Sequence, residues 1–372
     1  MSRIRSLWLF PMHGEIKLRA EGVRTRDGHL MEWFSRLGVD EMHVSSRPEP
    51  WPRRSWHRAR HPLPLGSSAF RWHSPQVLQG VLSTDRRTWW EKSSRSTAVW
   101  GSTTPDATIS WNPFAAAAIG ETKRKPPLAL DLIDDWTNHH QFAGICDSVA
   151  EAYRRSFEIA DLVFANSEGT MRLARRFGRD DAQLILNGVD PDRFSAESAA
   201  SGPTTIGYAG KISERIDVQL IRRAVEALPQ CRFEIAGQGI SRAVVNTLRR
   251  IPGLALLGDI HYRDYPRLLS TWDIGWIPHR IGAEGEIGGD VIKLYEYRAA
   301  GLPTFMTPIE GAGRGLSGVR IHTASDLVTA LVKFVGANNA ERIPREPTSI
   351  PTEMTWQSKA GLLLDALGRA RI

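Results

Sequence analysis

The segment from residue 288 to residue 296 combines groups that could bind a nucleoside diphosphate. Gly288 and Gly289 form a turn, and Asp290 can cap the helix that follows. Lys293 and Glu296 lie three residues apart in that helix and project from the same side. Free N–H groups at a helix N-terminus suit a phosphate when a lysine is nearby, and a carboxylate can accept from both hydroxyls of a ribose. The segment therefore predicts a phosphate-and-ribose site.

The same helix should pack on a sheet through Ile292, Tyr295 and Ala299. It should end at Gly301, and Pro303 prevents its continuation. A glycine turn before an amphipathic helix is also common in α/β proteins of other function, and a Lys–Glu pair is often only a solvated face. The rest of the chain has to decide between these interpretations.

Short apolar segments alternate with amphipathic ones along the chain, which predicts an α/β fold with mostly parallel sheets. A small, polar linker separates two such series. The expected domains are an acceptor-side Rossmann-like domain at 1–190, a linker at 191–204, a nucleotide-sugar domain at 205–345 and a returning C-terminal helix at 346–372. Expected strands are 6–10, 41–45, 97–101, 108–111, 128–132, 162–165, 205–209, 232–236, 254–257, 274–277 and 304–307. Expected helices are 27–37, 147–160, 167–177, 218–228, 241–250, 265–272, 325–334 and 356–367, the last stopped by Gly368.

Two doubly wound domains leave a cleft at the carboxyl ends of their strands, where ligands bind in such sheets. The composition agrees with a globular protein, because 41% of the 372 residues are hydrophobic and 24% are charged. Cys146 and Cys231 are too few for a disulfide framework or a cysteine zinc site, which favours the cytoplasm. The apolar stretch 7–10 is too short for a signal peptide and reads as a buried strand.

The net charge of +7 should attract polyanions or phosphorylated ligands. Arginines and tryptophans alternate between Arg47 and Arg60, with a second group at 86–90. This mixture favours an anionic membrane surface, and the alternative is a polar loop whose rings fold back on the domain. The expected location is the cytoplasm, including a peripheral position on the inner face of the plasma membrane.

Several ordered motifs resemble those of retaining glycosyltransferases of the GT-B fold, in the large family numbered four. The resemblance covers residues 128–335 well and the first hundred poorly. Its motifs are LVFANS at 162–167, LNGVD at 186–190 with Phe194, IGYAG at 206–210, EIAG at 234–237 with Gly239, Gly258 with Tyr262, Asp273 with Pro278, and the K-L-x-E-Y-x-A-x-G-x-P signature within 290–303.

The resemblance implies that this protein transfers a sugar from a nucleoside diphosphate-sugar to a glycan or lipid-linked acceptor, in cell-surface polysaccharide or glycoconjugate synthesis. Glu296 would hold the donor ribose. Gly210 and the turn at 288–289 would approach the diphosphate and the sugar through backbone N–H groups, and the donor contacts would also include Gly237 and Asp290. Neither a metal nor a separate cofactor is expected.

Cations are the expected catalysts, because such a site must stabilise negative charge on the departing diphosphate. The resemblance assigns this work to Lys211, Lys293 and Arg215. Asp135, with Asp134, follows a strand end and could bind acceptor or donor hydroxyls, and its alternative role is helix capping. Retaining members are thought to need no protein nucleophile: the acceptor attacks the face that the diphosphate leaves, and a phosphate oxygen takes its proton.

The chain departs from the family where an acidic residue usually stands, at Gly288. Glu284 or Glu286 could reach the sugar instead. Other hypotheses are a nucleotide-sugar epimerase of the same architecture, a degenerate scaffold and a basic nucleic-acid-binding protein. The last lacks any recognisable finger or RNA-binding signature, so no nucleic acid is expected as a partner. An NAD enzyme is not expected, because no G-x-G-x-x-G follows the first strand.

Three histidines are candidates for the acceptor side or for a metal site. His13, after the first strand, could line the acceptor side or simply be exposed. His139 and His140 are adjacent and would point apart on a helix, so they do not predict a metal site.

Overall fold

Two all-parallel sheets organise the chain into two α/β units, which are described separately here. The computed structural model describes residues 3–46, 49–51, 69–73, 76–78, 91, 93–94, 104–119, 126–139, 142–281, 290–338 and 342–370. Unit 1 comprises Met1–Leu186 and Trp356–Ile372, and unit 2 comprises Asn187–Thr355. The expected boundaries were 190, 205 and 346, so the segment expected as a linker belongs to unit 2.

Unit 1 contains a seven-stranded sheet of order β4-β2-β1-β6-β7-β8-β9. Its order reverses between β1 and β6, which places the switch point of the sheet after these two strands. The strands are β1 Ser6–Phe10, β2 Glu41–Val44, β4 Phe70–Trp72, β6 Ala107–Ser110, β7 Leu128–Leu132, β8 Leu162–Ala165 and β9 Gln183–Leu184, and β3 Glu49–Trp51 pairs with β5 Gln76–Leu78 separately.

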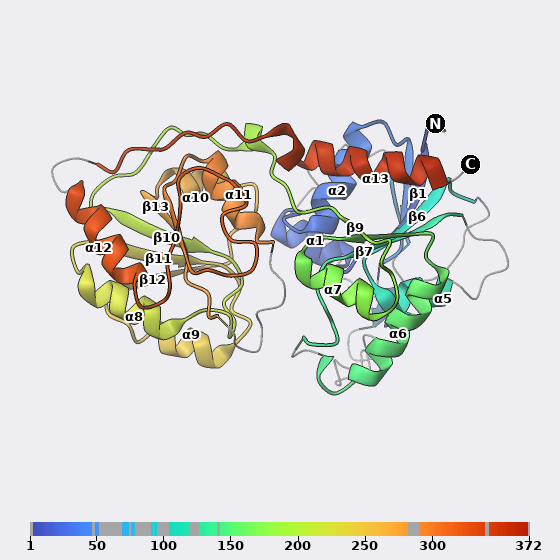
Figure 1. Ribbon diagram of the computed structural model, residues 1–372, viewed down its shortest axis with the longest axis horizontal. Coiled ribbons are helices and arrows are strands. Elements are labelled where there is room, and N and C mark those ends of the chain that lie inside the picture. Colours follow the sequence, from blue (N-terminus) through green and yellow to red (C-terminus); the bar gives the residue numbers. More distant parts are fainter. Residues whose placement is uncertain are drawn as a thin grey trace. The chain divides into compact units, whose positions relative to one another are not determined.

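Helices cover both faces of this sheet. Figure 1 shows α5 and α6 on one side, and α2 and α13 on the other. The returning helix α13 packs against α2, where the rings of His29 and Trp356 stack 4.8 Å apart. The helices are α1 Glu15–Glu21, α2 Arg26–Arg36, α5 Pro113–Ile119, α6 Cys146–Ile159, α7 Glu168–Arg176 and α13 Trp356–Ala370.

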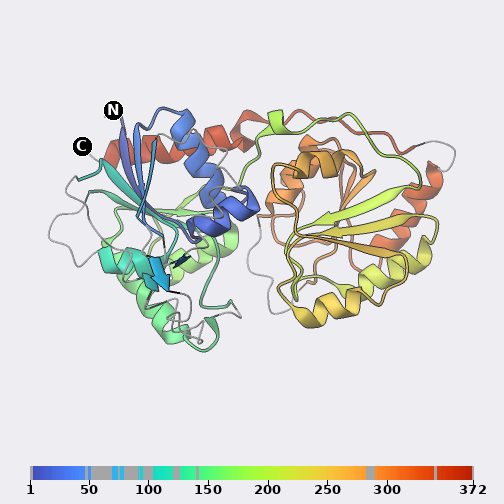
Figure 2. The same ribbon diagram turned by 180° about the vertical axis from the view of Figure 1, so that it is seen from behind.

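Unit 2 contains a six-stranded sheet of order β12-β11-β10-β13-β14-β15, which reverses between β10 and β13. Figures 1 and 2 show α8 and α9 on one side of the sheet, and α10 and α11 on the other. Its elements are β10 Thr205–Ala209, β11 Arg232–Ala236, β12 Leu254–Gly258, β13 Ile274–Ile277, β14 Thr304–Met306, β15 Val319–Ile321, α8 Val218–Ala227, α9 Arg242–Leu248, α10 Tyr265–Ser270, α11 Ile292–Ala299, α12 Leu327–Ala337, and the short 3-10 turns Pro191–Arg193 and Thr352–Met354.

The apolar patterns explain these layers. β10 is buried along its whole length, and two separate hydrophobic clusters lie on the faces of its sheet, one with Leu220 and Leu331 and the other with Leu269 and Leu294. Strands covered on both faces read as continuous apolar runs, which is how the sequence predicted them. The predicted α/β class with two doubly wound Rossmann-like units is confirmed.

Most element predictions are confirmed within one to three residues. One helix end was wrong, because α13 continues through Gly368, which is buried inside it. The expected strand at 97–101 and the group at 86–90 lie outside the described residues, and of the segment from Arg47 to Arg60 only the backbone of Glu49–Trp51 is described. Among the described residues, none of the helices is both long and apolar enough to cross a membrane.

A buried ion pair ties α2 to the sheet of unit 1. The Arg26 guanidinium donates to both carboxylate oxygens of Asp131, at 2.9 and 3.0 Å, and to the carbonyl of Leu186 at 3.2 Å. Trp111 Nε1 donates to the same carboxylate at 2.6 Å. Both ionic side chains are 1% exposed or less, so the pair has to be satisfied by these bonds.

Replacing Arg26 with Ala should therefore destabilise unit 1 strongly, because it leaves the Asp131 carboxylate buried without its cation. The expected loss is about 3–5 kcal/mol, measured by urea unfolding. Arg5→Ala removes an exposed ion pair with Asp40 and should leave the transition almost unchanged. Equal midpoints for the two variants would contradict this account.

Candidate active site

Three glycines at the carboxyl ends of adjacent strands in unit 2 allow the backbone turns to approach one another. Gly210 follows β10 and Gly237 follows β11, with φ of 153° and 145°. A Cβ on Gly237 would lie 1.8 Å from the carbonyl oxygen of Gly210, so no side chain fits there. The N–H of Gly237 in turn donates to the carbonyl of Gly258 at 2.6 Å.

The amides of Gly210 and Gly237 both make hydrogen bonds within unit 2, and a donor contact of either glycine stays a prediction. The N–H of Gly210 donates to the carbonyl of Ala236 at 2.9 Å, so both glycine amides are already used within the unit. Among the described residues, the N–H of Lys211 donates no hydrogen bond. The glycines thus provide close approach rather than N–H donors, and the amide that a ligand could use is the following one.

Lys293, from the first turn of α11, lies directly beside the Gly210 turn. A Cβ on Gly210 would lie 2.9 Å from Lys293 Cε and 3.1 Å from its Nζ. Burial and then the charges of Arg215 and, more weakly, Lys211 lower the pKa of Lys293 to about 8, while Glu296 opposes them. The predicted cations Lys211, Arg215 and Lys293 therefore share one region of unit 2, as an anion site requires.

Tyr208 contacts two of these cationic residues, Lys293 and Lys211. Its ring centroid is 5.0 Å from Lys293 Nζ, and its hydroxyl donates to the carbonyl of Lys211 at 3.4 Å. His279 Nε2 is hydrogen-bonded to the same hydroxyl at 3.2 Å. Burial and then the charges of Lys293 and Arg215 hold the pKa of His279 well below its usual value, so the imidazole adds no fourth positive charge at neutral pH.

The segment that carries Lys211 and Arg215 is fixed by the end of β13. Asp217 N–H donates to the Pro278 carbonyl at 2.9 Å, and Arg280 N–H donates to the Arg215 carbonyl at 2.8 Å. Asp217 then caps α8 by accepting from Leu220 N at 2.9 Å. Lys211 is exposed and Arg215 is half-buried, so both cations lie on a braced loop at the switch point of the sheet.

Glu296 is buried, so it does not belong to a solvated Lys–Glu face of α11. It is 4% exposed, and its Oε1 accepts from the Tyr262 hydroxyl at 2.8 Å. The helix is enclosed because Leu294, Tyr295 and Tyr297 are buried as well, whereas Ile292 and Ala299 are only half-buried. The Glu296 carboxylate lies near Lys293 and bonds a tyrosine hydroxyl. Its predicted contact with the donor ribose stays a prediction.

Asp290 does not cap α11, which corrects that prediction. Val291 is the N-cap residue. The Asp290 carboxylate accepts instead from Asn187 N–H at 2.5 Å, from the Tyr295 hydroxyl at 2.7 Å and from Arg314 Nε at 2.9 Å. Asn187 Nδ2 also donates to the Asp290 carbonyl at 2.6 Å. These bonds join the N-G-V-D segment to the start of α11, and a donor contact of Asp290 stays a prediction.

The other glycines predicted for the site and the acidic alternatives lie outside the described residues. These are Gly288, Gly289, Glu284 and Glu286, together with His140. No group of three metal-binding side chains occurs in the part of the chain that the structure describes.

Asp135 lies in unit 1 after β7, where its carboxylate is used locally. It accepts from Thr137 N at 2.9 Å, from the Thr137 hydroxyl at 2.5 Å, from Asn138 Nδ2 at 2.8 Å and from Arg176 Nη2 at 3.2 Å. The residue is only 7% exposed. The carboxylate orders a turn rather than capping a helix, which was its alternative role, and its catalytic role stays a prediction.

His13 is buried rather than an exposed loop residue, because it is only 5% exposed. Its Nδ1 is 3.6 Å from Asp27 Oδ2. Burial acts to raise the pKa of Asp27, but hydrogen bonds and the charge of His13, with help from Thr25 and Gly28, lower it to about 2. The pair lies after β1, near the switch point of the unit 1 sheet.

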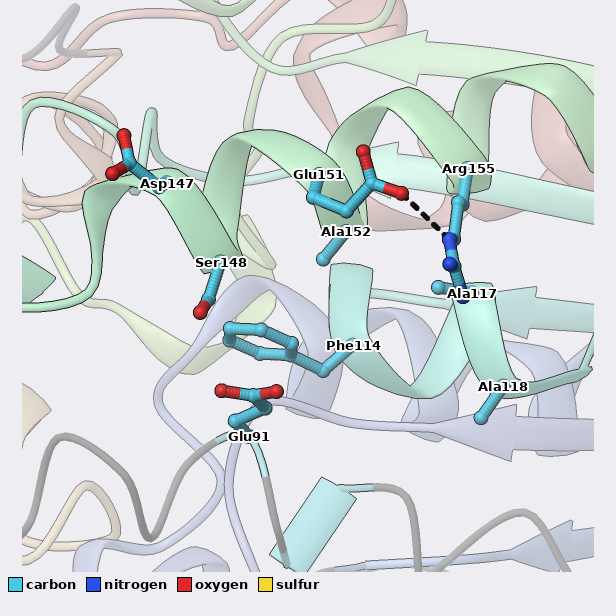
Figure 3. Close-up of a pocket in the computed structure, with 9 residues that line it drawn as sticks. All are labelled: Glu91, Phe114, Ala117, Ala118, Asp147, Ser148, Glu151, Ala152 and Arg155. Carbon is cyan, nitrogen blue, oxygen red and sulfur yellow. Dashed lines mark hydrogen bonds and ion pairs between the residues drawn. The ribbon is translucent and has the colours of Figure 1, made fainter.

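A pocket of about 280 Å³ lies elsewhere in unit 1, between α5 and α6. Figure 3 shows Glu91, Phe114 and Ser148 facing the same space, and Glu151 paired with Arg155. It is lined by none of the residues predicted for the site. Its other lining residues are Ala117, Ala118, Asp147 and Ala152.

Comparisons with known proteins bear on the family and the fold. Residues 21–188 match the model of the glycosyl transferase 4-like domain. These residues therefore carry a glycosyl transferase 4-like domain, and the fold of the chain is the GT-B fold of its solved neighbours. The matched region lies in the half that the sequence motifs covered less well.

The fold of the chain resembles several solved structures at low sequence identity. Sucrose-phosphate synthase from Thermosynechococcus elongatus has a TM-score of 0.66 at 13% identity, over 98% of this chain and 96% of that chain. Anabaena HepE, solved with UDP-glucose, has a TM-score of 0.60 at 14% identity, over 98% of both chains. A putative UDP-N-acetylglucosamine 2-epimerase from Listeria monocytogenes has a TM-score of 0.55 at 10% identity, over 98% and 96%. None of the curated proteins matches the sequence.

Sequence reasoning missed the residues that support the site of the glycosyltransferase. Tyr208, His279 and Arg314 were assigned no role, and Tyr262 appeared only as a motif residue. Arg314 has a φ of 41°, which is unusual for a residue other than glycine. The sequence signal for these residues was a polar side chain near the end of a strand. Their hydrogen-bond partners are distant in sequence, so no local motif shows the contacts.

The Lys293 amine should titrate near pH 8, since burial and its cationic neighbours disfavour its charge. Arg215→Gln should raise this midpoint by removing a like charge. The measurement is NMR titration of the isotopically methylated amine, with Lys293→Met to identify the signal. An ordinary lysine midpoint, unaffected by Arg215→Gln, would contradict the proposed cluster.

Proposed function

We propose that this glycosyltransferase takes its sugar from a nucleoside diphosphate donor held in unit 2 and transfers it to a glycan or lipid-linked acceptor with retention of configuration. The observation that carries the proposal is the position of Lys293 against the Gly210 turn, with Glu296 one turn further along the same helix. The spacing of these charges suits a diphosphate followed by a ribose.

The cations would act on the leaving group. Negative charge develops on the diphosphate as the bond to the sugar breaks, and positive groups fixed beforehand stabilise it without reorganisation. Lys293 is held over the Tyr208 ring, and Lys211 and Arg215 lie on the loop braced by Pro278 and Arg280. A neutral His279 fits this arrangement, because a fourth positive charge would add repulsion among the cations when no donor is bound.

The acid group would recognise the ribose. The carboxylate of Glu296 offers about four acceptor positions, and Tyr262 fills one of them. A ribose can donate two hydroxyl hydrogens to the same group. Donor binding therefore combines charge neutralisation at Lys293 with directional bonds at Glu296.

Retention would follow from the geometry of attack. The acceptor hydroxyl would approach the face that the diphosphate leaves, and a phosphate oxygen would take its proton. No nucleophilic side chain is required in this scheme. The basic and aromatic region at 47–60 is the segment proposed to meet an anionic membrane when the acceptor is lipid-linked, and synthesis of a cell-surface glycan is the pathway that such an acceptor would serve.

Replacing Glu296 with Ala should lower donor affinity or turnover by about tenfold or more, because a hydrogen bond to a charged group contributes about 1.5–3 kcal/mol. The measurements are thermal stabilisation by a panel of nucleoside diphosphates and their sugars, followed by turnover with the best donor. Glu226→Ala, an exposed glutamate on α8, is the matched control and should change neither. Unchanged affinity and turnover in Glu296→Ala would contradict the proposal.

The stereochemistry should be visible in the product. An α-linked donor sugar should give an α-linked product by NMR, and transfer should need an added acceptor. A β-linked product would exclude retention, and conversion of the donor sugar without any acceptor would favour the epimerase hypothesis.

A further inference from the structure

A buried tyrosine fixes the carboxylate of Glu296. The Tyr262 hydroxyl donates to Glu296 Oε1 at 2.8 Å, and the two residues are only 3% and 4% exposed. They are 34 positions apart in sequence. Tyr262 precedes α10, so the contact joins the loop before that helix to the middle of α11. A hydrogen bond to a buried charge is strong and directional.

The ring of Tyr262 is itself held from two sides. The Tyr265 ring stacks on it, with centroids 5.8 Å apart, and the Arg193 guanidinium lies 5.7 Å from its centroid. Arg193 is in turn bound to Asp190, with Nε to Oδ2 at 2.8 Å. The hydroxyl of Tyr262 therefore has little freedom to leave the carboxylate.

The protonation of Tyr262 keeps the bond in one direction. Burial raises its pKa well above the usual value, and the charge of Glu296 raises it further. The phenol therefore stays a donor throughout the physiological range, and the carboxylate stays its acceptor. Glu296 is thereby presented to a ligand in a fixed orientation.

A second tyrosine, Tyr265, places its hydroxyl near the same carboxylate. The Tyr265 hydroxyl is buried and makes no hydrogen bond of ordinary geometry within the described residues. Burial and then the charge of Glu296 raise the pKa of Tyr265, so its hydroxyl lies in the electrostatic field of that carboxylate. A buried hydroxyl in this state is costly unless a ligand completes its bonding, and a sugar hydroxyl can both donate and accept.

We infer that Tyr262 is a positioning residue that makes the site selective for ribose over deoxyribose in the donor. The inference rests on the proposed function, which assigns Glu296 to the ribose. A carboxylate fixed in advance loses less entropy when it binds a diol. A site built to bind a hydroxyl also rejects an analogue that lacks it, because its own polar group is left unpaired.

The test compares the best nucleoside diphosphate from the panel with its 2′-deoxy and 3′-deoxy forms, by calorimetry. The wild type should bind the ribose form at least about tenfold more tightly, since one charge-assisted bond is at stake. Tyr262→Phe should weaken the ribose form about five- to tenfold and change the deoxy forms less than about twofold, so that the preference disappears. With the sugar donor, KM should rise while kcat changes less than about twofold.

Thr304→Val is the matched control, because it also removes one buried hydroxyl of unit 2, which donates to the Leu302 carbonyl at 2.9 Å. It should lower stability but keep the ribose preference. If Tyr262→Phe does not fold, Glu296→Gln keeps the size of the side chain and should also abolish the preference.

The outcomes separate this inference from the proposed function. If no nucleoside diphosphate binds the wild type, the proposed function and the inference both fail. If the diphosphate binds but the wild type has no ribose preference, or Tyr262→Phe retains it, only the inference is overturned.

Discussion

The contact between the glycine turns after β10 and β11 is the constraint on which the candidate site depends. Gly237 meets the Gly210 carbonyl so closely that a single methyl group would separate the two turns. The same crowding puts Gly210 against the Lys293 side chain. β10 ends here, where the order of the sheet reverses between β10 and β13. A ligand at this edge could therefore contact the backbone of the turns on one side and the charged side chain of α11 on the other.

The electrostatics of unit 2 follow from that packing. Lys293 shares a small region with Arg215 and Lys211, and burial followed by these two charges lowers its pKa, while burial also keeps His279 neutral. Such an arrangement costs free energy in the empty protein, and an anion would relieve it. The buried acid Glu296 offsets part of the repulsion, and its bond to Tyr262 holds it in place. The clustered positive charges therefore favour an anionic ligand, as the proposed diphosphate would be.

The sequence predicted those parts of the fold that local patterns determine. β7 and β10 are buried on both faces and appear as apolar runs, and Ser167 was recognised as the cap of α7. Short edge elements such as β9, with only Gln183 and Leu184, have too few residues to show a period. α1 and α5 were also missed. α5 is a run of small apolar residues without an amphipathic pattern.

The site was predicted less completely, because its geometry depends on distant partners. The spacing of Lys293 and Glu296 is local and was found, whereas the burial of Glu296 depends on Tyr262. Asp290 looked like a helix cap, but Asn187, Tyr295 and Arg314 compete successfully for its carboxylate. The close approach of Gly210 and Gly237 likewise follows from strand pairing, which no short motif encodes.

The most direct measurement is a crystal structure of the protein with its preferred nucleoside diphosphate. The account predicts phosphate oxygens within hydrogen-bond distance of Lys293 Nζ and next to the Gly210 turn, with the ribose hydroxyls on Glu296. A nucleotide bound elsewhere, for example in the pocket between α5 and α6, with Lys293 and Glu296 untouched, would contradict it.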